Sequence, residues 1–393
     1  MDAADLGVKL YQPLGDHIIE SLTVTGYFSV TQTDPAEFVR DEYGLADDFS
    51  LVRGSHSLSF GVDALRAWVL LRNQFHQPGQ FGFTSDCSGD AMAAFLLGCM
   101  RTFLQGSGES KDNRINTYGL YFEDNYHVSQ RLTVNLGLRY DPFYPWKETK
   151  GRTEVFYPSA YYAGTPSQQF TNAPAGLLFP GDAGVPQYGL RPNFGNVSPR
   201  VGFAYDVRGD GKTSIRAGFG SFYDAIQNGI YNNRFVDVSP FSAQVNLTNP
   251  KGPFSNPYLG VANPFPAPYP PPVSIVFPTP VLGISYDTAN GGVYETPVVY
   301  GYNFTVEHQF RGDWLARAAY VGSLSRHLLE SQELSPYVYT PSQPLDKQRY
   351  LPPYSSISLA SQDINSHCNC SDAYDCWLWR GRRLGAGWRR RWQ

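Results

Sequence analysis

Apolar and polar residues alternate strictly over long parts of the chain. In the clearest segment the apolar positions are Leu132, Val134, Leu136, Leu138 and Tyr140. The positions between them are polar or small, namely Arg131, Thr133, Asn135, Gly137, Arg139 and Asp141. Successive side chains of a β-strand point to opposite faces of the sheet, so this segment is predicted to be a strand with one apolar and one polar face.

The same alternation recurs in segments that short turn signals join in pairs. The paired segments are residues 44–53 with 56–70, 115–128 with 131–143, 198–207 with 213–224, and 298–310 with 314–327. The connections between them are Arg53-Gly54-Ser55, Ser129-Gln130, Gly209-Asp210-Gly211 and Arg311-Gly312-Asp313. Short connections of this composition between alternating runs predict β-hairpins. A further strand is expected from Leu22 to Val30.

Long stretches rich in Gly, Pro, Asn and Ser separate the predicted hairpins, at residues 71–112, 145–196 and 225–297. Loops of this length are unusual inside compact soluble domains. They are typical of the extracellular side of outer-membrane barrels, whose periplasmic turns stay short. If every short turn is periplasmic, about nine strands alternate in direction without contradiction. One short helix is expected within the first long stretch, capped by Asp90 and running toward Gly98.

These patterns predict an all-β fold: part of a transmembrane antiparallel β-barrel with long extracellular loops and short periplasmic turns, in the bacterial outer membrane. Leu132, Val134, Leu136 and Leu138 are then expected to face lipid. Thr133, Asn135 and Arg139 are expected to face the lumen. Outer-membrane lipid is accordingly the first partner that the sequence indicates.

The composition fits a surface that meets lipid. Aromatic residues make up 15% of the chain and charged residues only 17%, below the roughly 25% usual in soluble domains. The net charge of -4 argues against a nucleic-acid partner, because phosphate binding needs a basic surface. No run approaches the ~18 consecutive apolar residues of a membrane-spanning helix.

Four segments carry a resemblance to a known family. They are His56-Ser-Leu-Ser-Phe-Gly-Val62; Tyr118-Gly-Leu-Tyr-Phe-Glu-Asp124 with residues 132–140; Ser198-Pro-Arg-Val-Gly-Phe-Ala-Tyr205 with residues 215–220; and Tyr302-Asn-Phe-Thr-Val306 with residues 319–323. In order and spacing the chain resembles, over roughly residues 20–365, the barrel of TonB-dependent outer-membrane receptors, in particular the Oar-like group. The resemblance implies a receptor or transporter that an inner-membrane energy-coupling protein energises, with a ligand that the sequence leaves unknown.

The chain departs from this family in several respects. No plug, energy-coupling box, regulatory domain or aromatic-ended last strand is found, so we expect a fragment that lacks the plug and the terminal strands. Residues 1–365 are predicted to form the partial outer-membrane barrel domain. Residues 366–393 do not alternate, and we expect an unstructured tail that contributes nothing to the fold.

No catalytic, cofactor-binding or metal-binding residues are predicted, and the protein is not expected to be an enzyme. Neither an H-E-x-x-H nor a G-x-S-x-G motif occurs. The group His367, Cys368, Cys370 and Cys376 is too closely spaced for a structural zinc site. Cys87 and Cys99 either pair in an oxidising compartment or remain two small apolar side chains, and the sequence leaves both open.

Candidate functional residues are the arginines of the polar strand faces: Arg131, Arg139, Arg200 and Arg216. In a receptor they would face the lumen and touch the plug or an anionic ligand, or they would be satisfied by ion pairs there. The leading hypothesis is a TonB-dependent receptor or transporter. One alternative is a structural or adhesive surface barrel without transport, and another is a secreted soluble β-rich glycan-binding protein.

Overall fold

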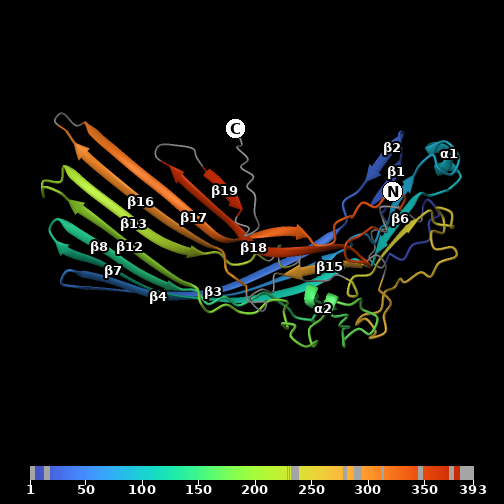
Figure 1. The fold of residues 1–393 in the computed structure, drawn as a ribbon, viewed down its shortest axis with the longest axis horizontal. Helices are drawn as coiled ribbons and strands as arrows, with labels where there is room; N and C mark the ends of the chain where they lie inside the picture. The colour runs from blue at the N-terminus through green and yellow to red at the C-terminus, as the bar shows by residue number, and fades with distance from the viewer. Residues whose placement is uncertain are drawn as a thin grey trace.

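The computed structural model describes residues 5–12, 18–227, 229, 231, 239–277, 281–286, 294–310, 314–343, 348–370 and 376–380. The described strands form one 12-stranded sheet, a 5-stranded sheet and a 2-stranded sheet. The long strands of the large sheet extend to the left in Figure 1, and the small sheets and both helices gather toward the opposite end. The molecule therefore has a wall of long strands and an outer region built from the connections between them.

The wall is the 12-stranded sheet. Its strand order is β15 (Val281–Tyr286), β18 (Tyr354–Cys370), β17 (Leu315–Glu333), β16 (Val298–Gln309), β13 (Thr213–Tyr223), β12 (Val197–Asp206), β8 (Leu132–Tyr140), β7 (Glu109–Ser129), β4 (His56–Asn73) and β3 (Ala36–Arg53), with β19 (Cys376–Arg380) on β18 and β9 (Lys147–Glu148) on β7. All pairs are antiparallel except β15 with β18. The eight strands expected as four hairpins are confirmed. The turn 311–313 lies outside the described residues.

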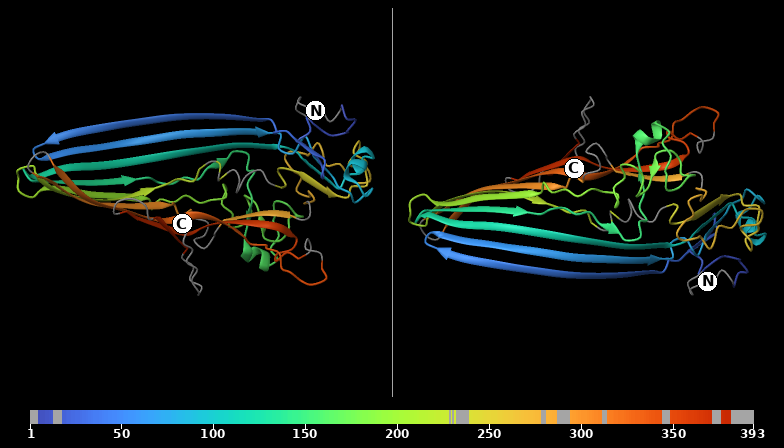
Figure 2. Two further views of the ribbon diagram at one scale, coloured as in Figure 1. Left: turned by 90° about the horizontal axis from the view of Figure 1, so that it is seen from above. Right: turned by 90° about the horizontal axis from the view of Figure 1, so that it is seen from below.

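The wall is open along β3. Within the described part of the chain this strand pairs only with β4, and all 18 of its residues are exposed. Figure 2 shows β3, in blue, along one side of the wall and β17 and β18, in orange to red, along the other. The fold class is thus an antiparallel transmembrane β-sheet of the barrel type that these strands leave unclosed.

The outer region contains the 5-stranded sheet, in the order β14 (Gln244–Thr248), β6 (Thr102–Gly106), β5 (Gln80–Phe83), β1 (Ser21–Val24) and β2 (Phe28–Thr31). The strand expected from Leu22 to Val30 is therefore wrong. The chain reverses at Gly26, whose φ of 82° is a left-handed conformation that glycine adopts without steric cost. The segment consequently forms the β1–β2 hairpin, in which Leu22 pairs with Val30, and it does not enter the wall.

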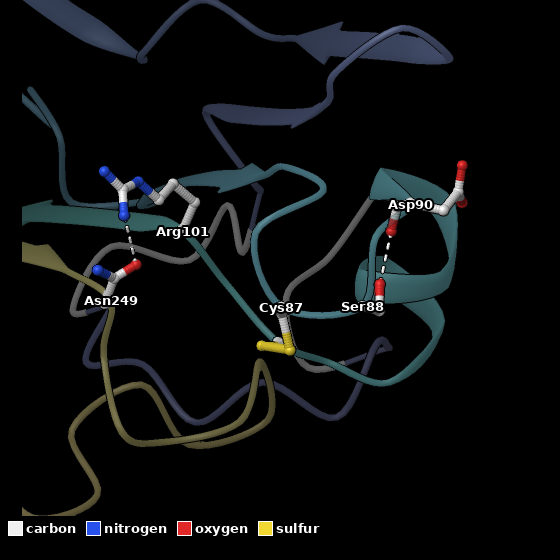
Figure 3. Close-up of a disulfide and its surroundings, with 6 residues drawn as sticks. Cys87, Ser88, Asp90, Arg101 and Asn249 are labelled. Atoms are coloured by element: carbon white, nitrogen blue, oxygen red, sulfur yellow. Dashed lines mark hydrogen bonds between the residues drawn. A yellow bond between two sulfur atoms is a disulfide. The ribbon is translucent and has the colours of Figure 1, made fainter.

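The expected helix is confirmed as α1 (Ala91–Leu96). The Asp90 side chain accepts a hydrogen bond from the backbone nitrogen of Ala93 at 2.9 Å, which satisfies one of the free donors at the helix start. Cys87 and Cys99 form a disulfide across this helix. Figure 3 shows Ser88 bonded to Asp90 beside the disulfide, and Arg101 bonded to Asn249 across the neighbouring loop at 2.8 Å. The question left open by the sequence is settled in favour of pairing.

Apolar burial is concentrated in the outer region and at the wall's nearby end. One cluster joins α1 to the 5-stranded sheet around Phe81, Phe83 and Phe103. A second surrounds the 2-stranded sheet of β10 (Val155–Phe156) and β11 (Leu177–Leu178), next to α2 (Pro158–Tyr162). A third includes Trp146, Tyr231 and Tyr294. None of the described helices is both long and apolar enough to span a membrane.

The expectation that residues 366–393 add nothing to the fold is wrong for two described segments. Residues 366–370 continue β18, where His367 pairs with Leu324 of β17. Residues 376–380 form β19, which pairs with β18. The sequence concealed this because polar residues occupy both faces of β18. Residues 371–375 and 381–393 lie outside the described residues, and the division into two domains at residue 365 stays a prediction.

Candidate functional site

The register of the wall separates its side chains into two faces. Residues paired across neighbouring strands lie on the same face, and every second residue along a strand lies on that face as well. Leu136 pairs with Val201, and Val201 pairs with Phe219, so one face is apolar. The positions one residue away carry the opposite face, which holds Asn135 and Arg139. The separation of faces expected for residues 132–140 is confirmed.

The apolar face is exposed rather than packed against other protein. Phe60, Phe122, Leu136 and Leu138 are 44–50% exposed. An apolar surface of this extent on a soluble monomer is unusual. It suits a sheet whose apolar face is covered by the hydrocarbon of a membrane.

The polar face holds a groove of about 560 Å³ near the middle of the wall. Two successive cross-strand rows form most of its lining. The first row is Glu123, Gly137, Arg200, Gly220, Gly301 and Ser323. The second row is Asn125, Asn135, Gly202, Gly218, Asn303 and Val321. Five glycines in adjoining rows leave the sheet without side chains there, and that absence hollows the groove.

Glycines on the polar face also let side chains reach over an entire strand. The Arg139 guanidinium on β8 donates to Asp63 on β4 at 2.8 Å and passes over Gly119 of β7. A Cβ atom at Gly119 would overlap both partners. In the same way, the Tyr121 hydroxyl on β7 donates to Asp48 on β3 and passes over Gly61 of β4. We call these contacts the over-strand bridges.

A third over-strand bridge closes one end of the groove. Arg200 of β12 lies 3.5 Å from Glu123 of β7, across Gly137 of β8. The Arg200 guanidinium also lies 4.9 Å from the ring centre of Phe222, which lines the groove too. This end of the groove is thus an ion pair beside an aromatic ring. The amides of Asn125, Asn135 and Asn303 and the Ser323 hydroxyl supply further polar groups of the lining.

Arg139, Arg200 and Arg216 share the polar face but do not converge on one point, and Arg131 lies in the turn before β8. Arg139 binds Asp63 and Asp141, each at 2.8 Å. Arg216 lies 3.8 Å from Glu307. Of the four, Arg200 alone lines the groove. Arg131 is exposed at the short-turn end, against Gly209.

The alternation predicted the polar strand face for Arg139, Arg200 and Arg216, in agreement with the register, but did not predict the groove. Its floor consists of glycines and asparagines. The sequence signal that could have revealed it is the recurrence of Gly at the polar positions of the alternating strands. The groove offers amide donors and acceptors, one guanidinium, one carboxylate and the Ser323 hydroxyl. This set can orient a polar solute by hydrogen bonds.

Among the described residues, the one His and carboxylate cluster with metal-ligand spacing lies away from the groove. It consists of Glu20, Asp34 and His76. Asp34 and His76 lie in segments that connect the 5-stranded sheet with the wall, and Glu20 immediately precedes β1. The groove therefore has no described metal ligands of this kind.

Comparison with protein families gives one match that spans almost the whole chain. A family model described as an outer membrane beta barrel domain matches residues 2–373. A search of curated proteins finds no significant match.

Solved structures with a similar course of the chain share little sequence with it. The outer membrane transporter YddB from Escherichia coli is 12% identical with a TM-score of 0.44, over 85% of this chain and 30% of that structure. The copper transporter OprC is 14% identical with a TM-score of 0.37, over 84% and 35%. The siderophore receptor PirA from Pseudomonas aeruginosa is 11% identical with a TM-score of 0.36, over 87% and 39%. The chain spans about a third of the length of these structures.

Proposed function

The chain belongs to the outer-membrane β-barrel domain family, and from this premise we propose that it forms the wall of a TonB-dependent receptor of the Oar-like group. The polar face of the wall lines the path of a polar solute in this proposal, and an inner-membrane energy-coupling protein drives uptake. Localisation in the outer membrane follows from the family itself.

The glycine-floored groove is the observation that carries the proposal. A wall that served only as an anchor would have no need of a hollow on its polar face. The groove's volume of about 560 Å³ lies within the ~300–1,000 Å³ range of small-molecule sites. Its amides and its Glu123–Arg200 pair suit an uncharged or zwitterionic solute with several hydrogen-bonding groups. Arg131, Arg139, Arg200 and Arg216 are accordingly lumen-facing in the proposal.

The test fills the groove and compares it with a substitution one residue away. Gly137→Trp places an indole on the polar face, whereas Leu136→Trp places the same ring on the apolar face, where aromatic side chains are tolerated. Cells that carry each version of the full-length gene are grown on a defined mixture of small metabolites. Depletion of the medium is followed by mass spectrometry, with and without a protonophore.

A transporter predicts protonophore-sensitive depletion of at least one compound, retained by Leu136→Trp and lost in Gly137→Trp at an equal outer-membrane level. Depletion that is the same in a deletion strain, or equal in both variants, would overturn the proposal. Disrupting the energy-coupling protein should abolish the same depletion.

A second candidate function is adhesion without transport. The observation in its favour is the apolar tip of the outer region, where Leu96 and Leu97 are 78% and 70% exposed beside the Cys87–Cys99 disulfide. An adhesive barrel predicts that Leu96→Ser with Leu97→Ser reduces attachment of cells to one another or to surfaces, while no compound is depleted from the medium.

A further inference from the structure

Three chain segments meet where the wall joins the 5-stranded sheet. Glu20 immediately precedes β1, Asp34 lies between β2 and β3, and His76 lies between β4 and β5. His76 Nδ1 is 2.9 Å from Glu20 Oε2, and the His76 backbone nitrogen donates to Asp34 Oδ2 at 3.1 Å. One ligand atom from each residue lies within 4.8 Å of the others.

Backbone hydrogen bonds hold the three segments together independently of these side chains. Gln32 donates to the carbonyl of Glu20 at 2.8 Å, and Gln74 donates to that of Pro35 at 3.0 Å. Glu20 in turn donates to Gly79 at 3.2 Å. The cluster is therefore preorganised, which lowers the entropic cost of placing an ion among its ligands.

The cluster has more negative charge and more acceptor capacity than its protein partners satisfy. The side chains of Glu20 and His76 are only 12% and 15% exposed. Asp34 Oδ1 is inaccessible to solvent and accepts no hydrogen bond, a state that costs free energy unless a cation or donor supplies the missing interaction. Two carboxylates thus face a single imidazole in a shielded position.

We propose that Glu20, Asp34 and His76 form a binding site for a divalent transition-metal ion, with Zn²⁺ as the best match. Imidazole with carboxylate is a donor set that suits zinc. Ligands about 2.1 Å from a tetrahedral ion lie roughly 3.4 Å from one another, so small movements of the three side chains would place their ligand atoms at three corners. Gln80, whose side-chain amide contacts both Glu20 and His76, is placed to offer its carbonyl oxygen as the fourth ligand after rotation of the amide.

An ion at this site would clamp the outer region to the wall. The ligands come from the segment that leads into β1 and from the β2–β3 and β4–β5 connections, so one ion would tie the start of β1 to two of the chain crossings between the 5-stranded sheet and the wall. The inference concerns assembly of the outer region and holds whether or not the groove carries a solute.

The chain provides a matched control in the pair His327 and Glu295. His327 Nδ1 lies 2.8 Å from Glu295 Oε2, and His327 has a φ of 58° against 59° for His76. No second carboxylate completes a metal-binding group around it among the described residues. The two histidines therefore share a left-handed φ and a glutamate partner, and they differ in the third ligand and in exposure, 15% for His76 against 43% for His327.

The first experiment titrates the purified full chain, folded in detergent and stripped with EDTA, with ZnCl₂ by calorimetry. We expect one equivalent to bind in the wild-type protein and in His327→Gln. Asp34→Asn and His76→Gln should weaken binding by more than the roughly 10–100-fold that loss of an outer-shell partner costs. Equal affinity in wild type and His76→Gln, or no binding by the wild type, would overturn the proposal.

A second measurement needs no variant and therefore survives a folding defect. Diethylpyrocarbonate modifies accessible histidines, and peptide mass spectrometry reports the extent at each one. Zn²⁺ should slow modification of His76 several-fold while His327 in the same sample is unaffected. Equal modification of His76 with and without Zn²⁺ would show that the cluster is an ion pair only, and would also overturn the proposal.

Discussion

The wall and the outer region are both made of β-strands, but the wall exposes apolar side chains that the outer region buries. On the wall, Phe122 and Leu138 are 47% and 50% exposed. In the outer region, Phe83 and Phe156 have no exposed surface. The wall carries its apolar side chains on a face that the bilayer covers, whereas the outer region stands in water and must enclose its own core. The same chain thus folds against two solvents, and each solvent selects a different arrangement of apolar residues.

Ion pairs are likewise more buried next to the outer region than on the polar face of the wall. Glu148 of β9, where the wall meets the outer region, and Arg152 just beyond it have side chains that are 0% and 5% exposed, and they are joined at 2.7 Å. Glu123 and Arg200 on the wall are 44% and 41% exposed, at 3.5 Å. Removal of one partner leaves an uncompensated charge only where water is excluded, so the wall tolerates the loss of an ion pair better than the outer region does.

The largest expected effect compares phenylalanine truncation in the two regions. Phe83→Ala should lower the free energy of unfolding by about 3–5 kcal/mol, because it leaves a cavity among the rings of Phe95 and Phe254. Phe122→Ala should cost roughly 1–2 kcal/mol, since lipid refills the space and only the transfer term is lost. Urea unfolding of lipid-folded protein measures both. Equal losses would contradict the distinction between the regions.

The next effect tests which face of the wall meets lipid. Leu136→Arg should cost ~2–4 kcal/mol near the midplane, because the charge enters hydrocarbon. Asn135→Arg, one residue away on the polar face, should change the free energy of unfolding by less than about 1 kcal/mol. Refolding yield into vesicles, read from heat-modifiable migration, gives a second readout. A larger loss for Asn135→Arg would reverse the assignment of the faces.

A third effect is confined to the outer region and depends on pH. Complete burial raises the pKa of the Glu154 carboxyl well above its usual range, and neither of its oxygens has a hydrogen-bond partner. The neutral form is favoured in the folded state, so stability is highest below the unfolded pKa of ~4.3 and falls as pH rises toward the folded pKa.

Glu154→Gln should remove this dependence. Wild type should lose up to ~1.4 kcal/mol per pH unit within that window relative to the variant, with the two equal near pH 4. Denaturant unfolding between pH 4 and 8, values chosen to bracket the unfolded pKa, measures the difference. A variant less stable than wild type at neutral pH would show that the carboxylate is satisfied when charged.

The smallest effect is the loss of an exposed pair on the wall. Glu123→Gln should reduce the free energy of unfolding by roughly 0.2–1 kcal/mol, because both partners are solvated and salt weakens their attraction. Added salt should reduce the difference further. A loss of several kcal/mol would mean that the groove excludes water, and the wall would then resemble the outer region.

Sequence alone predicted the wall far better than the outer region. The hairpin strands were recognised because alternation is a local property, and lipid on one face makes it strict. The outer core depends on contacts between distant segments, such as Phe81 and Phe83 with Phe254, which no local pattern reveals. The turn at Gly26 was missed for the same reason. Glycine can adopt an extended or a left-handed turn conformation, and only the formation of the 5-stranded sheet selects the turn.

The candidate site was only half predictable. Four arginines were assigned to the polar face by counting residues, and the register agrees for Arg139, Arg200 and Arg216, whereas the assignment of Arg131 stays a prediction. The groove arises from five glycines of four different strands that align in two rows, and no single segment of the sequence shows how residues align across strands. β18 was missed because Ser361, Gln362 and Asp363 interrupt the alternation that identified the other strands.

The over-strand bridges have a mechanical consequence for the wall. Each connects strands two positions apart on one face only, from Asp48 to Tyr121, from Asp63 to Arg139 and from Glu123 to Arg200. Flattening the sheet, or bending it away from the polar face, would stretch all three, whereas bending toward that face would not. The bridges therefore give the wall an asymmetric bending stiffness and favour curvature with the polar face inside, a preference set by side-chain reach rather than by the backbone ladder.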